Sequence, residues 1–433
     1  MEKLEFERVI RKSEERLYFT IPFEAPENIA KMEIAYDYPR FRTVEADGVT
    51  HREEINIIDL ALSAPGGECV GASGSDRSRI TISASYSSRG YARMSVRPGT
   101  WEIIVGAYKV ASEGVTVKYT VAFTEKEMRL YRGDVHTHTT ASDGALTSEE
   151  LVALCRKQRL DYVFVTDHNN CAENFNLPHP EDMTVIPGME WTHYKGHASL
   201  LGVERPLSSF FCVNTPEQAA ALLAEARAAG AMIVVNHPFC APECGWAWGM
   251  ERTPFDAVEA WNGALMHENE NTACLSWWHA QLLAGRRIPV IGGSDFHRTG
   301  PLSLPGVPCT CLYAPSRDPE DLMAALRQGH GYIKMYPDAP DLEARAGGAI
   351  LGDTAPAGAQ VEVRWSGLRP GDVLRTVTDA GMEEQACPPG ACAIQTSFES
   401  RNARFVRFEA LRTLARGLPA VRILVSNPIY FEA

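Results

Sequence analysis

Hydrophobic and polar residues alternate over short stretches in the first 125 residues. Segments such as "RLYFTIPF", "KMEIAYDY" and "VTVKYTVAFT" place an apolar residue at nearly every second position, and Gly, Pro, Ser and Asp fill the gaps between them. This period is typical of strands that bury one face, and several short strands at near-regular spacing indicate a β-sandwich. We therefore expect an N-terminal β-sandwich over residues 1–125.

A different pattern occupies residues 126–338, where continuous apolar runs alternate with helices that have recognisable caps. The helix starts are marked by Thr147 with Glu150, by Thr215 with Pro216, and by Asp318 with Pro319. Runs such as "DYVFVTDH", "AMIVVNHP" and "IPVIGGSDFH" are typical of strands covered on both faces. About seven such strands favour a parallel α/β barrel over an open sheet. Strand patterns return afterwards, so we expect a smaller C-terminal β-domain over residues 339–433.

Composition and charge narrow the classes of function. The apolar fraction of 45% and the charged fraction of 22% are those of an ordinary globular protein. A formal net charge of −13 argues against a broad basic surface for nucleic acid or an anionic membrane. We find neither a signal-peptide pattern nor an apolar run long enough to span a membrane. Eleven scattered cysteines without C-x-x-C spacing favour reduced thiols over disulfides or structural zinc. We expect a cytoplasmic protein.

Histidines and carboxylates gather where the predicted barrel strands end. Six of the twelve histidines and three carboxylates lie there, which is more than satisfied core histidines would explain. Barrel enzymes build their sites at the carboxyl ends of strands. The nine residues are His136, His138, Asp143, His168, Glu190, His197, His237, Asp295 and His297.

The segments that carry these nine residues resemble the motifs of the PHP (polymerase and histidinol phosphatase) superfamily. In chain order they are "GDVHTHTTASDG", "VTDHN", "GMEW", "KGHASLLG", "VVNHPF" and "GGSDFH". The flanking β-domains and the terminal "SNPIYF" resemble the CehA/McbA-type metallohydrolase branch. The resemblance implies a distorted (β/α)7 barrel, flanked by N-terminal and C-terminal β-sandwich-like domains, with a trinuclear metal centre.

The same resemblance implies a set of ligands for each of three divalent ions. One ion would take His136, His138, Glu190 and Asp295. A second would share Glu190 and add His197 and His237. The third would take Asp143, His168 and His297.

The residue chemistry points the same way independently. Imidazole and carboxylate ligands without thiolates suit manganese, iron or zinc. Three divalent ions contribute about +6 and three carboxylates −3, so the pocket would keep about +3, which favours an anionic substrate. We therefore expect a metal-dependent phosphoesterase that cleaves a small phosphorylated molecule with a metal-bridging hydroxide. The alternatives are a carbamate, ester or amide hydrolase on the same site, a nuclease, or a non-catalytic metal-binding protein.

Residues outside the nine have less specific signals. As catalytic residues we select Glu190, His237 and Asp295 among the ligands, with Arg298 and His267 nearby to bind phosphate or protonate the leaving group. Other candidates for substrate contacts are His193, Lys195, Asn262, Trp246, Trp248, Trp277 and Trp278. Asp167 precedes a ligand on its strand and should point away from the metals, either as a hydrogen-bond acceptor or as a core contact. We expect a small-molecule substrate, neither nucleic acid nor membrane as a partner, and make no prediction of oligomeric state.

Overall fold

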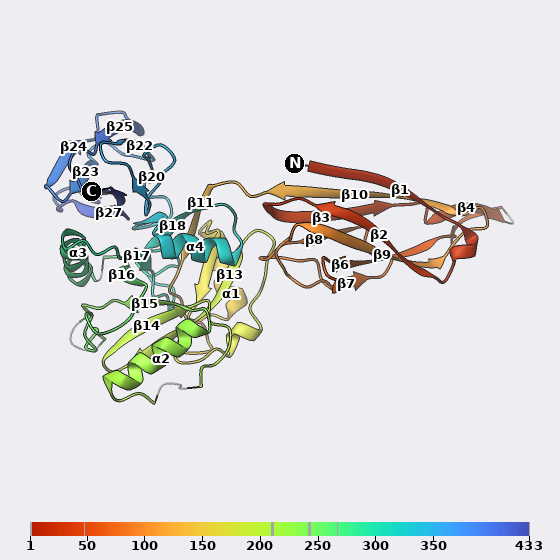
Figure 1. Cartoon of the computed structure of the whole chain (residues 1–433), viewed down its shortest axis with the longest axis horizontal. Helices are drawn as coiled ribbons and strands as arrows, with labels where there is room; N and C mark the ends of the chain where they lie inside the picture. The colour runs from red at the N-terminus through yellow and green to blue at the C-terminus, as the bar shows by residue number, and fades with distance from the viewer. Residues whose placement is uncertain (1, 47, 209–211, 241–243, 266, 433) are drawn as a thin grey trace. The chain divides into compact units, whose positions relative to one another are not determined.

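The chain falls into two compact units, Met1–Glu127 and Met128–Ala433 (Figure 1). The computed structural model describes residues 2–46, 48–208, 212–240, 244–265 and 267–432. The expected division into residues 1–125, 126–338 and 339–433 remains a prediction, and each unit is described separately.

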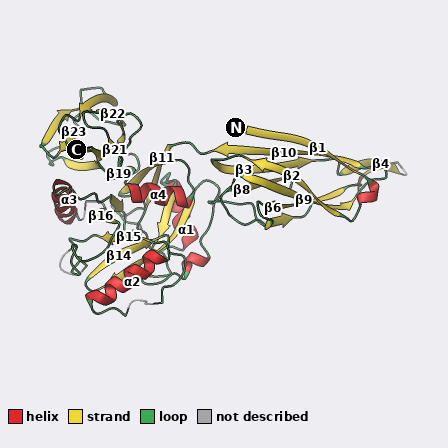
Figure 2. Ribbon diagram, viewed as in Figure 1, coloured by secondary structure: helices red, strands yellow, loops and turns green. Residues whose placement is uncertain are grey.

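The first unit is built almost wholly of strands (Figure 2). They are β1 Glu2–Ile10, β2 Tyr18–Ala25, β3 Ile29–Asp37, β4 Phe41–Ala46, β5 Val49–Glu54, β6 Ile57–Ala64, β7 Glu68–Ser73, β8 Arg79–Ile82, β9 Gly99–Lys109 and β10 Val115–Glu125, with one 3-10 turn at Lys12–Glu14. Two four-stranded antiparallel sheets, β1-β10-β3-β8 and β2-β9-β6-β7, share one hydrophobic core. On β10 the residues Val117, Tyr119 and Val121 are buried while those between them are not, as the two-residue period predicts.

The second unit begins with a curled sheet in the order β17-β16-β15-β14-β13-β12-β11-β18-β19. Its strands are β11 Arg129–Asp134, β12 Tyr162–Val165, β13 Thr184–His193, β14 Gly196–Leu201, β15 Met232–Asn236, β16 Ala257–Asn262, β17 Val290–Gly293, β18 Cys309–Ala314 and β19 Gly331–Lys334. Beyond the ends of β11 and β17, Thr137 forms a parallel bridge with Phe296. The sheet therefore curls far enough to bring the ends of β11 and β17 together.

The curled sheet is mixed, whereas the sequence predicted parallel strands. β14 runs antiparallel to β13 and β15, and β18 runs antiparallel to β11. Only Tyr194 and Lys195 separate β13 from β14, and a parallel neighbour would need a connection of a dozen or more residues. The helices α1 Ser148–Lys157, α2 Pro216–Ala228, α3 Glu268–Leu283 and α4 Pro319–Gln328 pack on β12, β15, β16 and β18 (Figure 1). The fold is mixed α/β with a curled sheet.

Three of these helices begin where their sequence caps predict. Thr147 accepts a hydrogen bond from the Glu150 backbone, and that capping box opens α1. α2 opens at Pro216 after Thr215, and α4 opens at Pro319 after Asp318. α3 was not predicted, because its N-cap residue, His267, is not one of the residue types that mark a helix start in a sequence.

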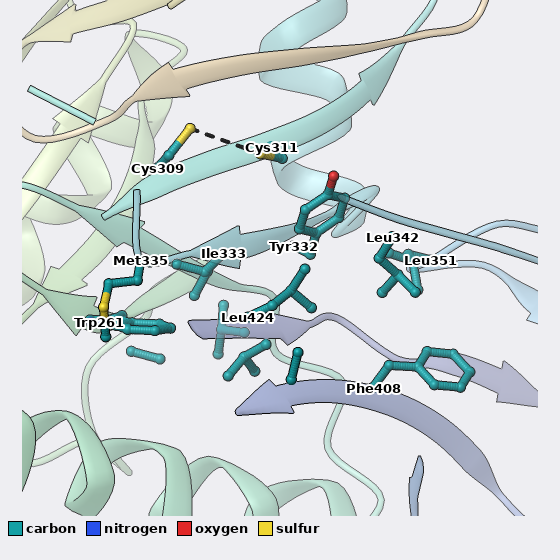
Figure 3. Close-up of a cluster of buried hydrophobic side chains, with 14 of the residues drawn as sticks. Trp261, Cys309, Cys311, Tyr332, Ile333, Met335, Leu342, Leu351, Phe408 and Leu424 are labelled. Carbon is teal, nitrogen blue, oxygen red and sulfur yellow. Dashed lines mark hydrogen bonds between the residues drawn. The ribbon is translucent and has the colours of Figure 1, made fainter. Parts of the chain in front are cut away.

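The C-terminal strands are β20 Asp341–Arg345, β21 Thr354–Ala355, β22 Gln360–Ser366, β23 Val373–Thr378, β24 Met382–Ala386, β25 Ala393–Glu399, β26 Phe405–Arg412, β27 Val421–Ser426 and β28 Ile429–Phe431. β20, β22 and β25 form a separate three-stranded antiparallel sheet, and the other strands continue the curled sheet. β27 pairs with β19, and β26 and β23 follow it. Figure 3 shows Trp261, Ile333 and Leu424 in the hydrophobic cluster that β16, β19 and β27 share. Barrel-like and C-terminal parts thus have a common core.

Two further expectations concern cysteines and membranes. Cys240 and Cys244 form a disulfide, which corrects the expectation of reduced thiols for this pair because their Cα atoms lie 5.4 Å apart. The other nine cysteines are free. No helix in the described ranges combines the length and the hydropathy that crossing a membrane requires.

Candidate metal centre

Glu190 is the centre of a buried cluster of imidazoles. It lies on β13 and is fully buried, and five histidine nitrogens lie within 3.6 Å of its carboxylate oxygens. The nitrogens and their distances are His136 Nε2 at 3.3 Å, His138 Nε2 at 3.6 Å, His168 Nδ1 at 2.8 Å, His197 Nδ1 at 3.2 Å and His237 Nε2 at 3.5 Å.

Two more carboxylates complete the cluster. Asp295 Oδ1 lies 3.3 Å from His136 Nε2, 3.1 Å from His138 Nε2 and 3.6 Å from His297 Nδ1. Asp143 Oδ1 lies 3.4 Å from His168 Nε2 and 3.2 Å from His297 Nε2. The structure thus brings all nine residues selected from the sequence into one continuous site.

Strand ends and strained backbone position these side chains. His136 and His138 follow β11, and the His138 backbone nitrogen donates to the Phe296 carbonyl next to Asp295. His237 and Asp295, which come just after β15 and β17, have φ angles of 29° and 52°. Non-glycine residues rarely adopt positive φ, and such strain concentrates at functional sites.

The donor set fits divalent metal ions. Four groups of histidine, aspartate and glutamate place their ligand atoms within 4.8 Å of one another, and His138 belongs to two of these groups. His136 Nε2 is buried, has no hydrogen-bond partner among the described residues, and lies 3.3 Å from both Glu190 Oε1 and Asp295 Oδ1. A buried polar atom without a partner is costly, so a cation between this nitrogen and the two carboxylates would satisfy it.

Glu259 orients two of the proposed ligands and was missed from the sequence. Its Oε1 atom accepts from His136 Nδ1 at 2.9 Å, which leaves Nε2 directed toward Glu190 and Asp295. Its Oε2 atom accepts from the His237 backbone nitrogen at 3.0 Å. The available signal was a carboxylate inside the otherwise apolar strand "AVEAWN".

Asparagines and a threonine orient other proposed ligands. Asn236 Nδ2 donates to Glu190 Oε1 at 2.8 Å, and Asn262 Nδ2 donates to Asp295 Oδ2 at 3.3 Å. His168 Nδ1 lies 2.6 Å from Thr192 Oγ1. Asn262 is buried and its side-chain amide also donates to Glu259, so that amide contacts two carboxylates.

Two buried aspartates hold the loops of the site. Asp167 Oδ1 accepts from the Thr139 backbone nitrogen and from Ser142 Oγ, both at 2.7 Å, next to Asp143. The expected role of Asp167 as a hydrogen-bond acceptor matches these contacts. Asp134 accepts from the Ser294 and Gly306 backbone nitrogens at 3.0 and 2.7 Å and thereby ties β11 to the segment after β17.

Charges in the cluster compensate one another. Burial raises the pKa of Glu190, but the imidazoles, His136 first, outweigh burial and hold that pKa well below its ordinary value. Burial lowers the pKa of His136, yet Asp295 and Glu259 outweigh it and raise that pKa well above the ordinary value. A metal ion that binds here must displace such protons, so metal binding should weaken at low pH.

Exposure is graded across the site. The side chains of His136, His138 and Glu190 are at most 1% exposed, whereas that of Asp143 is 61% exposed. His168 is 22% exposed, between these extremes. The cluster is therefore most open to solvent on the side of Asp143.

The remaining candidates have different surroundings. Arg298 is exposed, and its side chain makes no ion pair with a described residue. His267 lines a small cavity together with His237 and Asn262. His193 lies 2.8 Å from the Val213 carbonyl through Nε2, and Lys195 Nζ lies 4.8 Å from the centre of a Trp248 ring. Trp246, Trp248 and Trp278 are buried, and Trp277 is partly buried.

No family model matches the chain. One similar curated protein is the 5'-3' exoribonuclease Rnm of Escherichia coli (strain K12), which is 34% identical over 108 residues. That match covers 21% of this chain and 36% of the exoribonuclease, so the chain spans about a third of that relative's length.

Two solved structures resemble the chain at lower sequence identity. A two-domain protein from Bacteroides vulgatus ATCC 8482, containing a predicted PHP-like metal-dependent phosphoesterase, has a TM-score of 0.39 and 14% identity. It covers 70% of this chain and 96% of its own chain. An amidohydrolase from Chromobacterium violaceum, with bound sulfate and no metal, has a TM-score of 0.27 and 15% identity over 40% of this chain and 93% of its own.

Proposed function

We propose that the chain is a divalent-metal-dependent phosphoesterase of the PHP superfamily, with a (β/α)7-type barrel and a trinuclear site. The observation that carries the proposal is the buried Glu190 carboxylate, which has five imidazole nitrogens within 3.6 Å of its oxygens. A structural core would not gather so many ionisable groups around one carboxylate.

Each proposed ion has its own set of residues. His136, His138, Glu190 and Asp295 would hold one ion, Glu190, His197 and His237 a second, and Asp143, His168 and His297 a third. Manganese, iron and zinc all suit this donor set. Bound divalent ions supply Lewis-acid stabilisation of developing charge and lower the pKa of coordinated water.

The protein's own residues hold this arrangement and set its charge. Glu259 and Asn262 keep His136 and Asp295 in position, so that little reorganisation is needed during the reaction. Glu259, which is buried, adds a fourth carboxylate to the charge balance. Ions contributing about +6 against four carboxylates would leave about +2, lower than the +3 expected from the sequence but still favourable for a phosphate ester.

Leaving-group protonation is the remaining chemical requirement. Hydrolysis forms a bond from water oxygen to phosphorus and breaks the ester P–O bond, so the departing alkoxide needs a proton. We assign this role to the His267 imidazole, which lines a cavity beside His237, and assign phosphate binding at the exposed rim to Arg298.

A substrate panel on the full chain loaded with Mn²⁺ tests the proposal. We expect higher kcat/KM for p-nitrophenyl phosphate or bis(p-nitrophenyl) phosphate than for a naphthyl carbamate, because a positive multi-ion site engages phosphoryl oxygens. A carbamate preference of about tenfold, equal to roughly 1.4 kcal/mol in the barrier, would overturn the phosphoesterase assignment.

A matched pair of variants separates the site from contaminating activity. Glu190→Gln should remove turnover of every substrate in the panel. Glu343→Gln, which changes a carboxylate paired with Arg345 far from the cluster, should keep it. Equal activity in both variants would place the hydrolysis outside this site.

A second candidate is cleavage of a phosphodiester in a nucleic acid. The 34% identity to a 5'-3' exoribonuclease over 108 residues favours it, although the net charge of −13 does not. Incubation with 5'-phosphorylated single-stranded RNA, followed by gel analysis, tests it. Stepwise shortening from the 5' end in wild type but not in Glu190→Gln would support this candidate, and intact RNA would exclude it.

A further inference from the structure

A disulfide lies beside one of the proposed metal ligands. Cys240 and Cys244 are bonded to each other, and Cys240 follows His237 by three residues. A ring nitrogen of His237 and the two Sγ atoms all lie within 4.8 Å of one another. No other group of three or more possible metal ligands among the described residues contains sulfur. The disulfide therefore adjoins the metal centre but differs from it in donor type.

The His237 imidazole has one buried nitrogen without a partner. Its Nε2 atom lies 3.5 Å from Glu190 Oε1, on the side of the proposed ions. Its Nδ1 atom is buried and has no hydrogen-bond partner among the described residues. A histidine that binds metal through one nitrogen usually donates the other N–H group to a carboxylate, carbonyl or water, and a buried polar atom without a partner is costly. The ring beside the two sulfur atoms thus has an unused buried nitrogen.

Backbone contacts hold both cysteines near His237 independently of the S–S bond. The Cys240 nitrogen donates to the His237 carbonyl at 2.9 Å, and the Cys244 nitrogen donates to the Cys240 carbonyl at 3.3 Å. The Trp246 nitrogen donates to the Pro238 carbonyl at 2.9 Å, just outside the pair. Cleavage of the S–S bond would free the two side chains and leave these backbone contacts in place.

We propose that Cys240, Cys244 and His237 Nδ1 form a separate metal site, which binds a thiophilic divalent ion such as Zn²⁺ or Cd²⁺ when the two cysteines are reduced. Thiolates select soft ions, whereas imidazole and carboxylate donors such as those around Glu190 also suit harder ions such as Mn²⁺. Zinc bonds to sulfur and nitrogen are about 2.3 and 2.0 Å long, so ligand atoms around one tetrahedral ion lie roughly 3.5–4 Å apart. Small side-chain movements from the observed limit of 4.8 Å reach this spacing.

Two steps open and fill this site. A dithiol reductant gives two electrons and two protons to the disulfide, so the S–S bond breaks, Cys240 and Cys244 become thiols, and the reductant becomes a disulfide. The ion then forms two metal–sulfur bonds and one metal–nitrogen bond, and the two thiol protons pass to solvent. Without reduction the sulfur atoms are bonded to each other, and no thiolate is present to bind the ion.

Filling this site would weaken its neighbour. A neutral imidazole offers a lone pair on only one of its two nitrogens. If His237 Nδ1 binds the thiophilic ion, Nε2 carries the proton and no longer binds the second proposed ion beside Glu190. Reduction in the presence of Zn²⁺ would therefore lower turnover. This consequence, unlike the site itself, rests on the proposed phosphoesterase function.

Titration of the full chain with Cd²⁺ tests the site, because bonds from Cd²⁺ to thiolate give a charge-transfer absorption that bonds to imidazole or carboxylate lack. One sample is treated with dithiothreitol and then freed of it without air, and the other is left untreated. Under denaturing conditions the treated chain should contain eleven thiols and the untreated chain nine. We expect the reduced chain to show thiolate absorption from one more Cd²⁺ ion than the untreated chain. Equal absorption in the two samples, or eleven thiols before treatment, would overturn the proposal.

Variants assign the gain in absorption to particular residues. Changing Cys240 and Cys244 together to serine should abolish the gain. His237→Phe should weaken Cd²⁺ binding to the reduced chain about tenfold or more, because one of three ligands is lost. Cys212→Ser, which removes an exposed free cysteine, and Glu190→Gln, at the other site, should both keep the gain. A gain that persists in the double serine variant, or that disappears in Cys212→Ser or Glu190→Gln, would contradict the assignment.

Hydrolysis of p-nitrophenyl phosphate separates the site from its consequence. Reduced and untreated chains loaded with Mn²⁺ are assayed with and without added Zn²⁺. A larger fractional loss of turnover in the reduced chain supports the sharing of His237, and equal losses contradict it. If neither sample hydrolyses any phosphate ester, the proposed function fails, and the Cd²⁺–thiolate absorption alone decides whether the separate metal site exists.

Discussion

At the scale of single residues, the site depends on buried carboxylates that face imidazoles. Glu190 and Asp295 both contact His136 and His138. Burial raises the pKa of Asp295, but His136 outweighs burial and holds that pKa well below its ordinary value. Both groups are therefore anions that can bind a cation, and their main contribution to the site is their negative charge.

Replacing either Glu190 or Asp295 should abolish both metal binding and turnover. In Glu190→Gln and Asp295→Asn we expect hydrolysis to fall to the background rate, because a neutral amide binds a divalent ion much more weakly than a carboxylate. Elemental analysis, turnover and circular dichroism of the purified variants check this. Wild-type rates with unchanged metal content in either variant would refute the assignment of that residue.

Glu259 should affect metal affinity without binding metal itself. In Glu259→Gln one amide N–H group must face either His136 Nδ1 or the His237 nitrogen, both of which donate to Glu259. Metal affinity should fall roughly 10- to 100-fold, the usual effect of losing a hydrogen bond that orients a ligand. Competition with a chelator measures it. Glu251→Gln, at a surface ion pair with Arg286, is the control, and equal affinities in the two variants would contradict this role.

At the scale of elements, strand β26 contains buried charges as well as apolar side chains. Glu409 is 4% exposed, and it pairs with Arg407 on its own strand and with Arg422 at 3.2 Å. Burial raises the pKa of Glu409, but Arg407 and Arg422 outweigh burial and lower that pKa to about 2. β26 is thus tied to its neighbour β27 partly by charge.

Acid should weaken this tie in a defined range of pH. The pKa of Glu409 is lower in the folded chain than the value of about 4.3 in an unfolded one, so its contribution is present above pH ~4.3 and lost as pH falls toward 2. Between pH 6 and pH 2.5 the free energy of unfolding should fall by about 2 kcal/mol more in wild type than in Glu409→Gln. Urea unfolding at both pH values measures this. Parallel pH dependence in the two proteins would contradict it.

At the scale of the whole molecule, the candidate metal site belongs to only one of the two units. All nine proposed ligands belong to Met128–Ala433, and the first unit has its own hydrophobic core. The groups of possible ligand atoms within the second unit overlap at His138, Glu190 and His136, so several ions would share one network of side chains.

Metal content should reflect that network. We expect about three divalent ions per full-length chain purified without chelator, because nine ligands of the appropriate type converge. Elemental analysis of the purified protein measures this. A reproducible content below one ion per chain would exclude the trinuclear site, and activity that survives complete chelation would exclude a catalytic role for the ions.

Deleting the first unit tests the independence of the second. A chain of residues 128–433 should keep the metal content of the full chain, since no proposed ligand lies before residue 128. Its thermal unfolding should remain cooperative, because its hydrophobic core is its own. Loss of bound metal in a folded fragment would show that the first unit supports the site.

Much of this protein was determined locally along the chain. Alternation with a two-residue period predicted the strands of the first unit, and cap residues such as Thr147 and Thr215 predicted helix starts, because both signals act within a few residues. Ligand residues were recognisable because histidines and carboxylates at strand ends are conspicuous. Glu259 and Asp134 were not, since each looks like a single polar residue beside an apolar run, and only their partners reveal their roles.

Only tertiary structure decided how those local elements combine. The antiparallel placement of β14 depends on a short turn whose packing against Trp246 involves residues 50 positions apart in the chain. Helix α3 forms without a side-chain cap because burial of its Trp278 and Leu282 stabilises it. The bond between Cys240 and Cys244 and the orientation of His136 by Glu259 likewise follow from distances in space. Sequence patterns select the residue types, whereas packing sets which atoms meet.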